Sequence, residues 1–356
     1  MKILLLGEFS GLHKNLKEGL ISYGHKVTVA STGDDWKKIE SDIFLKIESD
    51  NRIKKIFNRF YLFFQLKDLL GYDIVHIINP FVFSFKYFPT SLYLYFIFKF
   101  NKKIYLSAAG DDSFYWKYGR EILKYGPFNS SLRYDIKQKK FWMESVKSFK
   151  FNQKLADRVD GIIPIMYEYE VAYKNHPKYL STIPLSISTN SIEYSPNIIK
   201  DKIVIFHGLN RYGFKGTKIV EEAFDVLSKK YPNDLELIID GNMPLDEYLK
   251  LIKRVNIIID QVFSHSCGMN ALYSLAMGKV VLGGAEPESL ASLKIDKSPV
   301  VNIKPTAKDI VKRVEYFLNN KEKIEEIGLE SRRFVEKYHE SKIVAQKYLN
   351  TWGSMI

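Results

Sequence analysis

Cysteine is almost absent from the sequence: Cys267 is the single one in 356 residues, so no disulfide can form within the chain. This scarcity is typical of proteins in a reducing compartment. Long apolar runs are missing too, because the opening MKILLLGEFS holds only four consecutive apolar residues, fewer than a signal peptide needs. The most apolar segment, FPTSLYLYFIFKF (88–100), is too short to cross a bilayer. We therefore expect a cytoplasmic protein, which could lie at the inner face of the cytoplasmic membrane.

Acidic residues are outnumbered by basic ones, 41 against 53, which gives a net charge of +12. Residues 51–150 hold 18 Lys and Arg against 7 Asp and Glu, interleaved with aromatic residues. An anionic membrane surface, a nucleic acid, a phosphate-bearing substrate or simply solvated basic faces would each fit this pattern. A nucleic acid is not expected, because zinc-ligand spacing, an RNP-like segment and a basic region leading into heptads are all missing.

Short apolar runs alternate with helical patterns along the chain. KILLLG (2–7), a helical pattern closed by Gly24, and HKVTVAS (25–31) together predict a strand–helix–strand unit. Further strands are expected at 72–80, 102–110 and 160–166. A second series starts at 202–210, after the turn-rich segment 184–201. We predict an α/β fold of two Rossmann-like domains, residues 1–190 and 200–340, facing a central cleft.

The loop GEFSGLH (7–13) lies at the carboxyl end of the first predicted strand, where open α/β sheets bind ligands. Gly7 and Glu8 are therefore candidates for a ligand site in the cleft. The same argument applies to Asp111 at a later strand end, although adjacent acids also often cap a helix. Further cleft candidates at strand ends are His13, His76 and Asp112.

The segment HGLNRYGFKGT (207–217) connects a predicted strand to a predicted helix. Gly208 allows close backbone approach, and Arg211 and Lys215 place two cations near the start of that helix. Backbone N–H groups, a positive helix end and fixed cations form an anion site suited to a diphosphate. The segment is neither a Walker loop nor a GxGxxG motif.

The segment HSCGMNALYSLAMGKVVLGG (265–284) begins with polar and small residues and continues as a helix and a strand. Gly268 at the helix start frees backbone amides, while Asn270 and Tyr273 offer polar groups on the first turn. His265, upstream of them, is a candidate for the same cleft. An apolar stripe on this helix is predicted to be core: Met269, Leu272, Leu275 and Ala276.

The two segments in this order, after an N-terminal strand–helix–strand unit, resemble the family-4 retaining glycosyltransferases, which have the GT-B fold. The resemblance implies that Arg211 and Lys215 hold the donor diphosphate and act in catalysis. It also implies that the turn from Gly268 through Met269 and Asn270 grips a nucleotide sugar, with Gly7 and Glu8 also on the donor side. Asp111 would then be a catalytic candidate, and the acceptor-side candidates would be His13, His76 and Asp112. A C-terminal helix, 341–356, would cross back to the N-terminal domain. GT-B enzymes generally need no bound metal, so no cofactor is expected.

The sequence departs from the family at the Glu-x7-Glu pair, which falls on His265 and Tyr273. The first family glutamate lies near the transferred sugar, which makes His265 a catalytic candidate, and the second holds the ribose, which makes Tyr273 a donor-binding one. A tyrosine hydroxyl can accept a ribose hydrogen bond but carries no charge at neutral pH. Glu286 or Glu288, after a later predicted strand, could replace the missing acid. No catalytic histidine transfers to the region of Asp111.

The expected activity is hexosyl transfer, with retention, from a nucleotide-diphosphate sugar to a glycan or lipid-linked acceptor in bacterial surface polysaccharide synthesis. Three alternatives remain open. The first is a GT-B sugar-nucleotide epimerase or hydrolase, which would alter the donor without an acceptor. The second is a non-catalytic sugar-nucleotide or glycan-binding protein, and the third is a nucleic-acid binder driven by the basic region.

Overall fold

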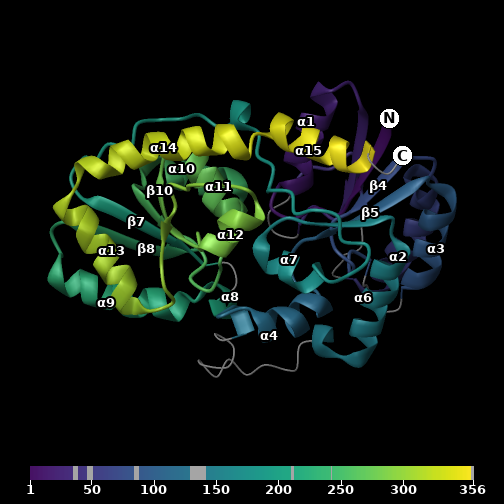
Figure 1. The fold of residues 1–356 in the computed structure, drawn as a ribbon, viewed down its shortest axis with the longest axis horizontal. Helices are drawn as coiled ribbons and strands as arrows, with labels where there is room; N and C mark the ends of the chain where they lie inside the picture. The colour runs from purple at the N-terminus through teal and green to yellow at the C-terminus, as the bar shows by residue number, and fades with distance from the viewer. Residues whose placement is uncertain are drawn as a thin grey trace.

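Two parallel β-sheets stand side by side along the long axis of the molecule (Figure 1). The structure, a computed structural model, describes residues 1–34, 39–45, 51–83, 88–128, 142–209, 212–241 and 243–353. The first sheet has the order β3-β2-β1-β4-β5-β6 and the second β11-β10-β9-β7-β8. Their strands are β1 Lys2–Leu6, β2 Lys26–Ser31, β3 Ile43–Phe44, β4 Ile74–Ile77, β5 Lys103–Ala108, β6 Gly161–Pro164, β7 Ile203–Gly208, β8 Leu235–Asp240, β9 Ile257–Ile259, β10 Val280–Gly283 and β11 Val301–Asn302.

Helices follow most of the strands, as parallel connections require. Among the described residues, no helix is both long and apolar enough to span a bilayer. The helices are α1 Leu12–Ser22, α2 Arg52–Gln65, α3 Thr90–Phe100, α4 Arg120–Ile122, α6 Val146–Arg158, α7 Tyr167–Tyr173, α8 Tyr212–Lys215, α9 Thr217–Lys230, α10 Leu245–Arg254, α11 Met269–Ala276, α12 Pro287–Ser292, α13 Ala307–Asn319, α14 Glu322–Tyr338 and α15 Ser341–Gly353. Short 3-10 or π turns lie at Leu66–Leu69, Tyr115–Gly119, Trp142–Glu144 and Thr189–Ser191.

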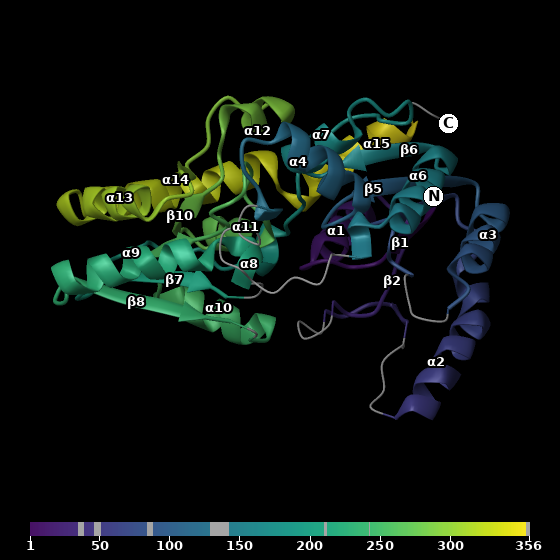
Figure 2. The same cartoon turned by 90° about the horizontal axis from the view of Figure 1, so that it is seen from below.

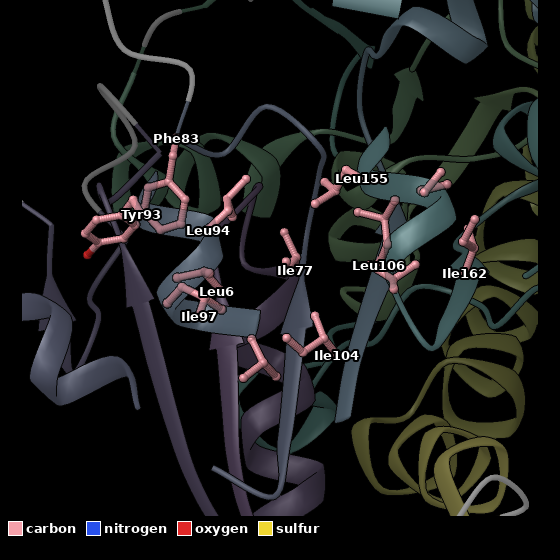
Figure 3. Packing of buried hydrophobic residues seen from close by; sticks show 14 of the residues in the cluster. Leu6, Ile77, Phe83, Tyr93, Leu94, Ile97, Ile104, Leu106, Leu155 and Ile162 are labelled. Carbon is pink, nitrogen blue, oxygen red and sulfur yellow. The ribbon is translucent and has the colours of Figure 1, made fainter. Parts of the chain in front are cut away.

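The first sheet is buried on both faces, which explains why its strands read as continuous apolar runs. On one face, Leu6, Ile77 and Leu106 pack against Ile97 of α3 and Leu155 of α6 (Figure 3). The alternate residues of β1 point to the opposite face and pack with α1 and α15. Each fully buried leucine or isoleucine contributes roughly 1.5–3 kcal/mol to folding.

The C-terminal helix α15 returns to the first sheet, although it follows the second sheet in the chain (Figure 1). Tyr348 and Trp352 of α15 are buried beside Ile3 and Leu5. The two-sheet architecture and this returning helix confirm the predicted fold. The predicted domain boundaries at residues 190 and 200 fall between β6 and β7 and stay a prediction. Residues 354–356 of the predicted terminal helix lie outside the described part of the chain.

Close packing of α1 against α15 leads to the first prediction. A Cβ on Gly19 would lie 2.1 Å from the backbone oxygen of Ser341 and 2.8 Å from the Cβ of Ala345. Gly19→Ala should therefore lower the free energy of unfolding by about 1–3 kcal/mol, measured by urea denaturation. Helix propensity alone would raise stability by up to about 1 kcal/mol. An increase in the free energy of unfolding would therefore contradict the close packing of α1 against α15. Glu18→Ala, on the exposed side of the same helix, is the control.

Candidate functional site

A cavity of about 630 Å³ lies where the carboxyl ends of strands from both sheets meet. Parallel strands bring the loops that follow them to one edge of a sheet, and a ligand site forms there. The volume is within the usual range of small-molecule sites. The loops after β1, β2, β4, β5 and β6 supply one wall, and residues 215, 260–261 and 268–270 supply the other. The polar lining residues are Glu8, Ser10, Ser31, Thr32, Asp34, Asn79, Asp111, Tyr169, Lys215, Asp260, Gln261 and Asn270.

The loop after β1 is a tightly packed part of this lining. Gly7 has a φ of 92°, and a Cβ there would lie 2.3 Å from Cγ2 of Ile78, so only glycine fits. The next residue, Glu8, is buried, and its Oε2 accepts a hydrogen bond from the backbone N–H of Lys14 at 2.8 Å. Burial raises the pKa of Glu8 to about 7, and the nearby charge of Asp34 acts in the same direction. The cavity thus contains a carboxyl group that titrates near neutral pH.

Lys215 provides a cation on the opposite wall. It is the last residue of α8 and is buried, and its backbone oxygen accepts a hydrogen bond from the N–H of Val262 at 3.0 Å. Gly216, with a φ of 72°, packs against Val262 and Phe263 and makes the turn into α9. Burial lowers the pKa of the neighbouring His207 to about 3, and the Lys215 charge contributes. His207 is therefore neutral beside a fixed ammonium group.

The amino end of α11 completes this wall. Gly268 precedes the helix in an extended conformation, and its N–H donates to Oδ2 of Asp260 at 3.3 Å. Met269 and Asn270 form the first turn and line the cavity. Unpaired backbone N–H groups and the helix dipole favour an anion at such an end. Lys215 and the start of α11 therefore share one wall of the cavity with the Asp260 carboxylate.

Solved structures of similar fold align with nearly the whole chain. Sucrose-phosphate synthase from Thermosynechococcus elongatus aligns with a TM-score of 0.65 at 12% identity, over 100% of this chain and 99% of that one. Anabaena HepE, solved with UDP and glucose, gives 0.63 at 11% identity, over 99% and 100%. This chain has the GT-B fold. WaaG, a glycosyltransferase involved in lipopolysaccharide biosynthesis, gives 0.59 at 10% identity, over 98% of both chains. No protein-family model and no curated protein matches the sequence.

The GT-B cavity includes some of the residues predicted from the sequence but not all. Gly7, Glu8, Asp111, Lys215 and the turn 268–270 line it together. Gly208 does not line it, although a Cβ there would lie 3.6 Å from Nζ of Lys215. Arg211 lies outside the described residues. The roles of all these residues stay predictions.

Tyr273 lies outside the cavity lining, and its donor-binding role stays a prediction. Its side chain is buried, and its hydroxyl accepts a hydrogen bond from Nδ2 of Asn15 on α1 at 3.2 Å. Gly11 allows this approach, because a Cβ there would lie 2.5 Å from the Tyr273 oxygen. Burial also raises the pKa of Tyr273 to about 12. Tyr273 therefore joins α11 to α1.

His265 and Glu286 belong to a second cluster outside the cavity lining, and their predicted roles stay predictions. The His265 ring is buried and stacks on Tyr125, with ring centroids 4.3 Å apart. Burial lowers the pKa of His265. Glu286 accepts a hydrogen bond from the Tyr125 hydroxyl at 2.6 Å, and Glu288 forms an ion pair with Lys124 at 2.6 Å. These contacts connect the segments on either side of α11 to the N-terminal part of the chain.

The acceptor-side candidates are buried, and their acceptor role stays a prediction. His76 is fully buried in β4, bonds Ser107 Oγ at 2.7 Å, and packs 5.1 Å from the ring of Tyr348. His13 is buried next to it and contacts the backbone oxygen of Gly7 at 2.7 Å. Burial lowers the pKa of both histidines, to about 4 for His13, so both are neutral. None of the three acceptor-side candidates lines the cavity.

Asp112 is the third of these candidates, and the structure gives it a capping role. Its carboxylate accepts hydrogen bonds from the N–H of Tyr115 and the hydroxyl of Tyr173, both at 2.7 Å. Burial raises the pKa of Asp112 to about 6. Asp112 therefore starts the helical turn after β5, the alternative that adjacent acids suggest, while Asp111 lines the cavity.

Three polar residues that line the cavity or support its wall were not predicted from the sequence. Asp260 and Gln261 follow β9 and line the cavity, so the strand-end rule applied to NIIIDQ would have found them. Glu168, buried on α7, accepts hydrogen bonds from the backbone N–H groups of His265 and Ser266 at 2.7 and 2.8 Å. The hydroxyls of Ser264 and Ser266 donate to it as well. No local signal in the sequence indicates that contact.

The pKa of Glu8 leads to a prediction about pH dependence. The folded protein binds this proton more tightly than the unfolded chain, since its pKa rises from 4.5 to about 7. The stability that this tighter proton binding contributes is fully present below the unfolded pKa of 4.5, and it is lost as the pH rises to about 7. Between about pH 4.5 and 7, Glu8→Gln should gain up to about 3 kcal/mol of stability relative to the unaltered protein.

Urea denaturation of both proteins at several pH values measures this difference. Glu18→Gln removes a carboxylate from the exposed side of α1 and serves as the control. A Glu8→Gln difference that stays constant with pH would show that the Glu8 carboxyl titrates equally in both states.

Proposed function

We propose that the protein is a glycosyltransferase that moves a hexosyl group from a nucleotide-diphosphate sugar to a glycan or lipid-linked acceptor. The observation that carries the proposal is the two-sided cavity. One wall holds the buried Lys215, the amino end of α11 and the Asp260 carboxylate, and the other holds polar and carboxyl side chains from the loops that follow strands of the first sheet. Such a division suits an anionic donor on one side and a hydroxyl-bearing acceptor on the other.

Lys215 and the first turn of α11 would hold the diphosphate. Charge builds up on the diphosphate as the bond to the sugar breaks, and fixed positive groups lower the energy of that state. Arg211, by the resemblance of its segment, would add a second cation. These groups would offset the diphosphate charge without a metal. The complexes of HepE with UDP and glucose support UDP-glucose as the first donor to test.

The first-sheet wall would bind the acceptor. Glu8, Asn79 and Asp111 line it and offer hydrogen-bond partners to sugar hydroxyls. Asp111 keeps its predicted catalytic role. Retention of anomeric configuration follows from the family resemblance. The lipopolysaccharide role of WaaG and the basic region 51–150 support a surface-polysaccharide acceptor on a lipid carrier, with the protein in the cytoplasm at an anionic membrane surface.

A non-catalytic sugar-nucleotide-binding protein is the second candidate. It is favoured by one observation, namely that His265 and Tyr273, at the positions of the family's two glutamates, are buried in structural contacts. Such a protein would bind the donor and release no UDP even with an acceptor pool. A hydrolase or epimerase would consume or convert the donor with no acceptor present.

Binding of UDP or UDP-glucose should raise the melting temperature, because a ligand that binds only the folded state stabilises it by about 2.7 kcal/mol at 100 times its Kd. Lys215→Ala should abolish most of the shift. Lys218→Ala is the matched control, since Lys218 lies three residues away on α9 and pairs with Glu221 on the surface. If no nucleotide or nucleotide sugar stabilises the protein, the donor assignment is wrong.

UDP release from UDP-glucose, measured with and without an extract of bacterial glycans and glycolipids, then separates the candidates. Release that depends on the acceptor supports transfer. Release without it supports hydrolysis, and stabilisation without release supports the binding protein.

A further inference from the structure

Helix α2 presents four large aromatic side chains to solvent. Phe57, Phe60, Tyr61 and Phe64 are 68, 63, 54 and 73% exposed. Their spacing of three, one and three residues places them on one side of the helix. Isolated exposed apolar residues are ordinary, but a contiguous aromatic group of this kind marks an interaction surface.

The opposite side of α2 is anchored to the rest of the protein. Leu62 is fully buried, and its backbone oxygen accepts a hydrogen bond from the Tyr93 hydroxyl of α3 at 3.2 Å. The Phe63 ring packs 5.6 Å from the rings of both Phe88 and Tyr93. Figure 2 shows α2 at the edge of the molecule, extending away from the two sheets. The aromatic group is therefore held outward by a helix that is fixed on its inner side.

The charge of α2 selects the kind of partner. The helix contains four basic residues and no acidic one: Arg52, Lys54, Lys55 and Arg59. Aromatic side chains favour the boundary between headgroups and acyl chains, and basic side chains are attracted to anionic headgroups. An anionic bilayer satisfies both properties, whereas a second copy of this chain would bring the four positive charges together.

The surface lies next to the first-sheet wall of the cavity. Nε2 of Gln65, at the end of α2, donates to the backbone oxygen of Phe44 at 3.0 Å, and the following residue, Leu45, lines the cavity. Val82 also lines the cavity, and its neighbour Phe83 packs 4.7 Å from the ring of Tyr93. A bilayer bound at α2 is therefore close to the wall assigned to the acceptor.

We propose that α2 docks the protein on an anionic phospholipid bilayer by inserting Phe57, Phe60, Tyr61 and Phe64 between the headgroups. The docking surface brings a lipid-linked acceptor to the first-sheet wall, and this consequence rests on the proposed transferase function. The docking itself involves no sugar and is measured without one.

Flotation with vesicles of phosphatidylcholine, with and without about 30 mol% phosphatidylglycerol, tests the proposal. The protein should float with the anionic vesicles and much less with the neutral ones. The double variant Phe60→Ser, Phe64→Ser should reduce the bound fraction at least about fivefold, because two inserted rings are lost. The matched control is Val226→Ser, Tyr316→Ser, which removes two side chains, each 48% exposed, from α9 and α13. The control should float as the unaltered protein does.

Equal flotation of the two double variants would overturn the proposal, as would absence of binding to anionic vesicles. Light scattering without vesicles tests whether a second copy of the chain covers this surface. A dimer that dissociates only in the Phe60, Phe64 variant would overturn the proposal. Thermal stabilisation by UDP-glucose is recorded for every variant. Loss of flotation with retained stabilisation supports docking, and absence of stabilisation in all variants counts against the transferase function alone.

Discussion

Two buried polar side chains of the N-terminal part of the chain hold the cavity together. Asn15 of α1 donates to the Tyr273 hydroxyl and accepts from the N–H of Ser188, so it connects the first sheet, α11 and the segment between the sheets. Glu168 of α7 accepts hydrogen bonds from the segment 264–266 before α11. Breaking such a buried contact leaves unsatisfied polar groups, which is strongly unfavourable. The strand ends of both sheets face one cavity because these contacts fix them there.

These contacts also explain the two unusual residues of the helix segment. Tyr273 lies against Gly11 and Asn15, and His265 lies against Tyr125. At both positions, where the resembling family has glutamates, this chain has an uncharged group in a buried contact between the two halves. On the cavity wall that also carries Asp260, the groups that could hold an anion are then Lys215 and the first turn of α11. A donor held mainly through its diphosphate is the chemistry that this wall supports.

Much of the fold could be predicted from the sequence, because parallel strands buried on both faces read as apolar runs between helical patterns. The position of the cavity could also be predicted, because open parallel sheets bind ligands at the carboxyl ends of their strands. This strand-end rule indicated Gly7, Glu8 and Asp111, which line the cavity. The strand-end rule does not indicate the surroundings of a residue within a strand, and His76 of β4 points to the face that α15 covers. That helix is more than 260 residues away in the chain, so no local pattern reveals it. Glu168 and its partners are separated by 96 to 98 residues, and the same reason applies.

A crystal structure with UDP-glucose would show whether the cavity binds a nucleotide-diphosphate sugar by its diphosphate. We expect the diphosphate between Nζ of Lys215 and the backbone N–H groups at the start of α11, with the sugar toward the first-sheet wall. A nucleotide bound outside the cavity, or with its diphosphate against Glu8 and Asp34, would show that the donor is not held in this way.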